Sequence, residues 1–373
     1  MSHSPEPVVL VASAEFTLKS SPVRRTLEQR LIDDLKIALA RAGLHGFRIE
    51  KNAARLVVRG LHESSHAALS CSRVFGVAYA ASALLVPASM QDVMETIVDL
   101  AEGGLRTGQS FAIRSHRSEP GPLSRRDIEL KGGSEVLQAL KSRGVRVDLK
   151  QPDVTFYVDL VGDRAYVYSE RFQGPGGLPL SSQWKMLAVL DSGPLTILAA
   201  YAMMRRGCLV ELFVPLSNNI PSFASDYQLS LARKLREFVT RPSYRVFTVE
   251  FERLLGDGIK NNPPGLAGSR HLVRLAAAEL AKEKRFKGII FADIAGKIGP
   301  TKTRDFTGKQ LPFFCPLIGL EREDLLEMCR LAGIPEAELL SHATVGGHEP
   351  VLPVVGSTHP KDLSDVQIQQ LSL

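Results

Sequence analysis

The residues best suited to chemistry follow a short apolar strand near the middle of the chain. Residues 186–190, MLAVL, have the pattern of a buried strand, and residues 191–194, DSGP, form a tight turn before an alanine-rich helix that ends near Arg206. A strand that turns directly into a helix gathers free backbone N–H groups at the positive helix end, where phosphate groups bind. The pattern therefore predicts a phosphate or nucleotide site at this turn.

A second group of candidate residues is basic and lies in the first half of the chain. It consists of Arg114, His116, Arg117, Arg125 and Arg126, at the end of a predicted strand and just before a predicted helix. Guanidinium groups and a helix N-terminus that meet at one edge can bind the phosphates of a folded RNA. The sequence leaves a second interpretation open, in which these arginines pair with Asp127, Glu129 or Asp148.

The elements before residue 174 predict α+β structure. The pattern gives a strand at 8–12, a helix from Ser20 or Ser21 to Gly43 with leucines at every fourth position, and strands at 47–50 and 55–59, typical of a ferredoxin-like domain. A second module follows, with strands and helices in alternation up to about Arg171. The predicted strands are 74–85, 110–115, 145–149, 154–161 and 164–171, and the predicted helices are 90–100 and 126–141.

Strands alternate with helices beyond a glycine- and proline-rich linker at 173–179, which predicts an α/β domain with a parallel sheet. The predicted strands are 186–190, 209–215, 244–250 and 288–292, and the predicted helices are 194–206, 224–239, 269–284 and 322–332. Ligands of such sheets bind at the carboxyl ends of the strands. We therefore expect Asp191, Ser192, Gly193, Ser217 and Asp293 to share one crevice.

Composition narrows the class of protein. The 373 residues carry a net charge of +6, which favours an acidic partner such as RNA. No apolar run is long enough to span a membrane and the N-terminus lacks a signal-peptide pattern, so we expect a cytoplasmic protein without a membrane partner. The cysteines show no spacing typical of a metal site, so no metal is predicted and they are expected to be reduced packing residues. They are Cys71, Cys208, Cys315 and Cys329. For Cys315 the sequence leaves open a redox role instead of a packing role.

Three stretches make the chain similar to the tRNA 4-thiouridine synthetase family. SAEFTLKSSPVRRTLEQRL resembles the family's N-terminal signature, FAIRSHRSEPGPLSRRDIELKGGSEVLQAL followed by VRVDLKQPDVTFYVDL resembles its THUMP domain, and GGLP precedes a PP-loop-like turn. The resemblance implies a ferredoxin-like domain at 1–70, a THUMP domain at 71–173, a PP-loop ATP pyrophosphatase-like α/β domain at 174–345 and a tail at 346–373. It also implies that tRNA or another structured RNA is bound by the five basic residues above together with Lys19, Arg24 and Arg25. The sequence leaves a second interpretation open for these last three, in which they are only solvated charges on the surface.

The PP-loop of the family, SGGxDS, falls on residues 191–196, DSGPLT. Gly193 and the hydroxyl of Thr196 remain, Ser192 stands at a glycine position, and Leu195 replaces the acid. Asp191 replaces the first serine, and a carboxylate there would repel pyrophosphate.

A second family segment, TGExxGQVxSQT, corresponds to FADIAGKIGPTKT at 291–303. It keeps Gly296, and carries Asp293 for the glutamate and Lys297 for the glutamine. Lys297 can hold a phosphate or face water, and the sequence leaves both open. The resemblance makes Ser192, Gly193, Thr196, Asp293, Gly296 and Lys297 the candidate nucleotide site.

Two functions follow from these departures. Family members take sulfur on a cysteine after the last helix, whereas SHATVGGHEPVLPVV has none. The first hypothesis is therefore a tRNA-binding pseudoenzyme with a degenerate PP-loop and no catalytic residues, which acts as a scaffold, a dimerisation surface or the partner subunit of an enzyme. The alternative is an active, divergent tRNA sulfurtransferase that uses ATP and Mg²⁺ to adenylate a uridine for thiolation.

Overall fold

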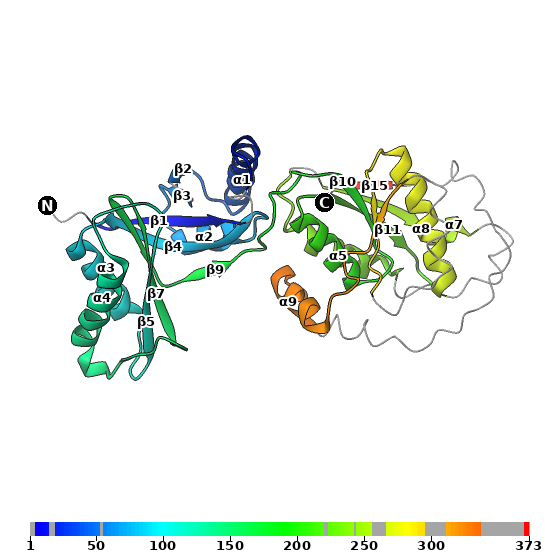
Figure 1. The fold of residues 1–373 in the computed structure, drawn as a ribbon. Helices are drawn as coiled ribbons and strands as arrows, with labels where there is room; N and C mark the ends of the chain where they lie inside the picture. Colours follow the sequence, from blue (N-terminus) through cyan, green and yellow to red (C-terminus); the bar gives the residue numbers. More distant parts are fainter. Residues whose placement is uncertain are drawn as a thin grey trace. The chain divides into compact units, whose positions relative to one another are not determined.

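The computed structural model describes residues 4–14, 19–52, 55–219, 223–241, 244–255, 266–294, 311–336 and 369–372. The chain divides into two compact units, Met1–Gly177 and Leu178–Leu373 (Figure 1). The division falls inside the glycine- and proline-rich segment at 173–179.

The first unit is built on one nine-stranded sheet with the order β2-β3-β1-β4-β8-β7-β5-β6, in which β9 also pairs with β4. Its strands are β1 Glu6–Ser13, β2 Arg48–Asn52, β3 Arg55–Arg59, β4 Val77–Pro87, β5 Ser110–Arg117, β6 Arg146–Val147, β7 Val154–Val161, β8 Arg164–Tyr168 and β9 Arg171–Gln173. Its α-helices are α1 Ser21–Arg41, α2 Ser64–Ser72, α3 Met90–Gly104 and α4 Arg125–Ala139. Parallel pairing of β5 with β7 and β6 adds a crossover to a sheet that is otherwise antiparallel.

Two contacts explain why both halves of this sheet form one unit. Asn52 Nδ2 donates a hydrogen bond to Tyr166 Oη at 2.7 Å, and Arg55 Nε donates to Asp159 Oδ2 at 3.1 Å. Around them, buried side chains of β1, β3 and β4 pack with tyrosines of β8 in one apolar cluster. The ferredoxin-like part and the THUMP-like part therefore share a core.

Helices α3 and α4 cover one face of β5, β7 and β8, and Figure 1 shows both helices beside these strands. Phe111 of β5 and Phe156 of β7 are fully buried and meet edge to face, with ring centroids 6.3 Å apart. Ile97 of α3 and Ile128 of α4 are also fully buried in this core. Because α4 is fixed on β5, the residues at the start of α4 have a defined position.

The second unit contains a six-stranded sheet with the order β14-β13-β10-β11-β12-β15. Its strands are β10 Lys185–Val189, β11 Leu209–Leu216, β12 Arg245–Glu250, β13 Ile289–Ile290, β14 Phe313–Phe314 and β15 Gln369–Ser372. Its helices are α5 Pro194–Arg205, α6 Ser225–Arg236, α7 Phe251–Leu254, α8 Leu266–Glu283 and α9 Arg322–Ala332. All pairs are parallel except β12 with β15, which confirms the predicted α+β half followed by an α/β half.

The strand order places a topological switch point at β10. The chain runs from β10 to β11 and β12 on one side, and then returns to β13 on the other side of β10. The carboxyl ends of β10 and β13 carry Asp191 and Asp293, and α8 packs on β10 and β13 with an apolar face that includes Val273 and Ala277. Ligands of doubly wound sheets bind at such a point.

Helices α2 and α7 and strands β14 and β15 were not predicted from the sequence. The buried apolar residues of α2 are only two alanines and one cysteine, α7 is a single turn, and β14 is two residues long, so none of them gives a clear periodic pattern. Strand β15 lies in the segment that was predicted to be a tail, and its place is set by antiparallel pairing with β12 rather than by its own sequence, QQLS.

Candidate RNA-binding surface and nucleotide site

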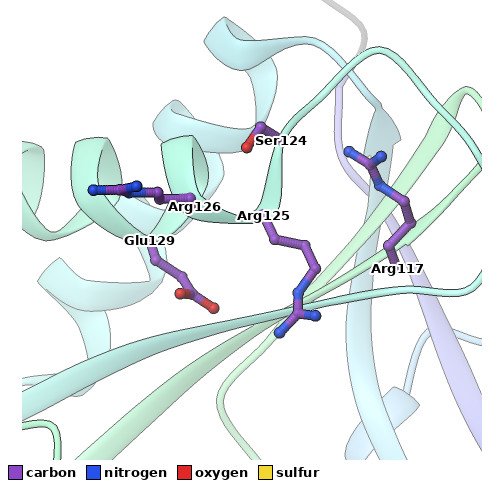
Figure 2. Close-up of a pocket in the computed structure, with 5 residues that line it drawn as sticks. All are labelled: Arg117, Ser124, Arg125, Arg126 and Glu129. Carbon is purple, nitrogen blue, oxygen red and sulfur yellow. The ribbon is translucent and has the colours of Figure 1, made fainter.

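An open hollow of about 420 Å³ lies where β5 ends and α4 begins. Its walls are Arg117, Ser124, Arg125, Arg126 and Glu129. Figure 2 shows Arg117 on the strand, Ser124 where the chain enters α4, and the other three on the first turns of that helix. Three guanidinium groups and a helix N-terminus therefore border one concave surface. This combination suits phosphate oxygens, because arginine donates in a fixed fork and the helix end is positive.

A network centred on Ser115 fixes the helix side of the hollow. The Ser115 N–H donates to Glu129 Oε1 at 2.8 Å, and the Ser115 hydroxyl donates to the Arg125 carbonyl at 3.0 Å. Arg125 Nε in turn donates to the Ser115 carbonyl at 3.0 Å. Glu129 is thus held by β5, and Arg125 is oriented by its Nε while its terminal nitrogens make no further hydrogen bond within the described residues.

Arg117 stands on the opposite wall and has no partner in the part of the chain that the structure describes. Its Nε is buried and makes no hydrogen bond with any described residue, and no ion pair reaches its guanidinium group in that part of the chain. A buried polar donor without an acceptor is costly, so this atom is suited to an external ligand.

The remaining predicted RNA-binding residues are not among those that line this hollow. Arg114 is exposed and donates to the Leu149 carbonyl at 3.1 Å, and His116 Nδ1 is 3.5 Å from the Ser118 hydroxyl. Lys19, Arg24 and Arg25 lie just before and in the first turn of α1, where Arg24 Nε is 3.8 Å from Glu28 Oε1. No hydrogen bond or ion pair between described residues joins these three to the hollow.

The alternative pairing of the arginines with nearby carboxylates is not seen. Within the described residues, no ion pair links the five basic residues of β5 and α4 to Asp127, Glu129 or Asp148. Asp148 instead accepts hydrogen bonds from the N–H groups of Gln151 and Lys150, which lower the pKa of its carboxyl group.

The switch point of the second unit is occupied by an arginine of α8. Arg274 Nε donates to Asp191 Oδ2 at 2.6 Å, and its two terminal nitrogens donate to the Asp293 oxygens at 3.0 and 2.9 Å. The guanidinium carbon lies 4.4 Å from the centroid of the Phe291 ring. Arg270 Nε adds a hydrogen bond to the Asp191 carbonyl at 3.2 Å. We call Asp191, Arg274 and Asp293 the ion triad.

The ion triad is largely removed from water. The side chains of Asp191, Arg274 and Asp293 are 0%, 9% and 23% exposed. Burial lowers the pKa of Arg274, but the two carboxylates more than offset it, so the net pKa is raised and the group stays charged. Both carboxylates of this centre are therefore paired with the same guanidinium group.

The residues of the turn after β10 differ in how they are placed relative to the ion triad. Ser192 and Gly193 lie at the carboxyl end of β10, where the Ser192 hydroxyl donates to Asp191 Oδ1 at 2.9 Å and Gly193 has a φ of 57°, a conformation that favours glycine. Thr196 is fully buried, and its hydroxyl donates to the Val189 carbonyl at 3.2 Å. The Thr196 hydroxyl is therefore buried and hydrogen-bonded to the last residue of β10.

The structure brings Asp191, Ser192, Gly193 and Asp293 together as expected, but Ser217 donates to Glu252 Oε1 at 2.5 Å. Gly296 and Lys297 lie outside the described residues. Sequence reasoning missed Arg274, although a single arginine among the apolar residues of HLVRLAAAEL was the available signal. No group of three or more potential metal ligands occurs in the described ranges.

Family models match three consecutive parts of the chain. Residues 8–81 match the ThiI ferredoxin-like domain, residues 87–170 match the THUMP domain, and residues 181–348 match the model described as thiamine biosynthesis protein (ThiI). The chain belongs to the tRNA 4-thiouridine synthetase family.

Two curated relatives match most of the chain. A tRNA sulfurtransferase of Pyrobaculum aerophilum is 28% identical over 92% of this chain and 70% of its own length. A probable tRNA sulfurtransferase of Aeropyrum pernix is 29% identical over 88% of this chain and 83% of its own length. The similarity therefore covers nearly the whole of this family member.

Two solved structures share the fold. A 4-thiouridine synthetase, crystallised as an RNA complex with bound ATP, has a TM-score of 0.69 and 18% identity, with 90% of this chain and 87% of that chain covered. A protein of Pyrococcus horikoshii has a TM-score of 0.66 and 23% identity, with 88% and 100% covered. No helix in the described ranges is both long and apolar enough to cross a membrane.

Cys315 is the cysteine nearest the ion triad of this family member. Its Sγ lies 3.8 Å from Asp293 Oδ2, and the residue is partly buried. Burial and the negative charge of Asp293 raise the pKa of the Cys315 thiol to about 11. Because a sulfur nucleophile must be a thiolate, this environment disfavours sulfur chemistry at Cys315.

We expect Cys315 to react with iodoacetamide about a hundredfold more slowly at pH 8 than a small free thiol, because a raised pKa leaves little thiolate. The rate should increase as the pH rises towards the thiol pKa of about 11. Mass spectrometry of the modified peptides measures it, with fully buried Cys329 as an internal control. Fast modification of Cys315 at pH 7 would contradict this expectation.

Proposed function

We propose that this family member binds tRNA through the hollow between β5 and α4, and that its α/β unit does not activate RNA with ATP but serves as a scaffold or partner subunit. The ion triad is the observation on which the proposal rests. The guanidinium group of Arg274 pairs with both Asp191 and Asp293 at the switch point, where a nucleotide would otherwise bind.

The described residues do not fit ATP with Mg²⁺ at this turn. A magnesium ion takes oxygen ligands, usually carboxylates together with phosphate oxygens. Both carboxylates at the switch point accept short hydrogen bonds from Arg274, and the apolar Leu195, only 4% exposed, stands at the acidic position of the family loop. Freeing the carboxylates for a metal would leave Arg274 buried without its partners, which is unfavourable.

RNA binding is supported by the unpartnered donors of the hollow. Among the described residues, Arg117 lacks a partner and Arg126 makes no ion pair, and Glu129 is held by Ser115. Curated relatives are named tRNA sulfurtransferases, and one solved structure with this fold is an RNA complex. We infer that tRNA is the partner and the cytoplasm the place of action.

The test is equilibrium binding of ATP by calorimetry, with and without tRNA, together with an assay of pyrophosphate release. We expect tRNA to bind, ATP to remain unbound at millimolar concentration, and no tRNA-dependent pyrophosphate to form. A curated relative that uses ATP in the same assay is the positive control. Release of pyrophosphate that depends on tRNA would reject the scaffold.

The alternative is an active, divergent sulfurtransferase, which the names of the curated relatives favour. It requires Arg274 to leave Asp191 or Asp293 when ATP and Mg²⁺ bind, so that Mg²⁺ and the arginine compete for a carboxylate. If ATP binds, the variant Asp191→Ser distinguishes the active sulfurtransferase from the scaffold. It restores the serine of the family loop and removes the repelling carboxylate, so ATP affinity should rise in an active enzyme.

A further inference from the structure

Three loops of the α/β unit lie side by side at the amino ends of its strands, opposite the ion triad. The Gln183 N–H donates to the Gly207 carbonyl at 3.0 Å, and the Leu209 N–H donates to the Trp184 carbonyl at 3.1 Å. The Lys287 N–H donates to the Lys185 carbonyl at 2.9 Å. The segment before β10 is thus flanked by the turn after α5 on one side and by the turn after α8 on the other.

Both flanking turns carry exposed cations. Arg205 and Arg206 end α5, and Arg285 and Lys287 follow α8. None of these four makes an ion pair or a side-chain hydrogen bond within the described residues. Basic residues are common at helix C-termini because they complement the helix dipole. That explanation covers Arg205 and its neighbour Arg206, the C-cap of α5, but it does not cover Lys287, which lies beyond the end of α8.

Trp184 lies between these cations and is the only tryptophan of the chain. Its side chain is 59% exposed and makes no ring contact with any described residue. A large indole left in water loses the stabilisation that burial would give. Neighbouring Lys185 is not free, because its Nζ pairs with Glu211 at 2.9 Å.

We infer that this surface, Trp184 with Arg205, Arg206, Arg285 and Lys287, is a second RNA contact, on which an unpaired base stacks on the indole and the cations bind the flanking phosphates. An exposed aromatic ring among unpaired cations is the arrangement that single-stranded nucleic acid uses, since every base has a face that can stack. The inference rests on the proposed RNA binding and adds a site on the second unit.

Trp184 is also the reporter for the test. We expect saturating tRNA to change Trp184 emission and to reduce its quenching by acrylamide at least threefold, because a stacked base covers the ring. The R285A/K287A variant should bind tRNA about tenfold more weakly at about 0.1 M salt, since two phosphate contacts are lost. W184A should lose about fivefold, and W184F should retain most of the affinity.

The control variant R322A/R330A removes two positive charges from α9 and should leave tRNA affinity within about twofold. Binding of labelled tRNA is followed by anisotropy in the same samples. If tRNA binds but Trp184 emission and acrylamide quenching stay unchanged, the second contact is wrong and the proposed function stands. If no tRNA binds at all, both are wrong. Equal losses in the α9 control and R285A/K287A would also overturn the inference.

Discussion

Replacing Arg274 by methionine is expected to lower the free energy of unfolding of the α/β unit by about 3–5 kcal/mol. The change leaves Asp191, whose side chain has no exposed surface, and Asp293 facing each other without the cation that separates them. A buried carboxylate and a partly buried one then lose the cation that offsets their desolvation. Methionine keeps much of the side-chain volume, so the loss reports on charge more than on a cavity.

Denaturant unfolding followed by Trp184 fluorescence measures this loss, because the single tryptophan lies in the second unit and reports on that unit alone. The variant R330A is the control, since Arg330 forms an exposed pair with Glu336 at 3.0 Å and such pairs contribute at most about 1 kcal/mol. Arg274→Lys should lie between the two, because lysine keeps the charge but cannot bridge both carboxylates. A loss below about 1 kcal/mol for R274M would show that the triad does not hold this unit together.

The order of elements was predictable because the relevant patterns are local. Leucines at 27, 31, 35 and 39 predicted one buried helical face, and all four are buried in α1. The apolar run before Asp191 predicted the central strand β10. Family resemblance, which depends on long ordered motifs in the first half, predicted the ferredoxin-like and THUMP domains, and the family models confirm both.

The contents of the candidate nucleotide site were not predictable from the same patterns. Asp191 looked like a charge that would repel pyrophosphate, and sequence alone gave no partner for it. Its partner Arg274 is 83 residues away and belongs to a helix whose periodicity predicts only a packed face. Whether an arginine in such a helix points to water or to a carboxylate depends on which strand end the helix covers, and that is a property of the tertiary fold.

The limits of the predicted domains, 1–70, 71–173, 174–345 and 346–373, stay predictions. Tertiary contacts join the first two into one unit through Asn52, Arg55 and the tyrosines of β8. Each of those residues has an ordinary local role in its strand, so the shared core leaves no signal in the spacing of the sequence.

Replacing Arg114, Arg117 and Arg125 together by alanine is expected to weaken tRNA binding about a hundredfold or more at about 0.1 M salt. Each phosphate contact releases about one counterion, so the slope of log affinity against log salt should become shallower by about two to three. Arg117 should account for the largest single share, because its buried Nε has no partner among the described residues and gains an acceptor when RNA binds. Anisotropy of labelled tRNA, repeated at several salt concentrations, measures both quantities.

The matched control is the triple variant K36A/R106A/K141A, which removes the same charge from an exposed position of α1 and from exposed positions just after the ends of α3 and α4. A general electrostatic attraction would weaken equally in both variants, since it depends on net charge alone. A contact surface at the start of α4 would weaken only in the first. The salt slope therefore decides the matter: an unchanged slope in the arginine variant means that phosphates do not bind in this hollow, even if affinity falls through a loss of folding.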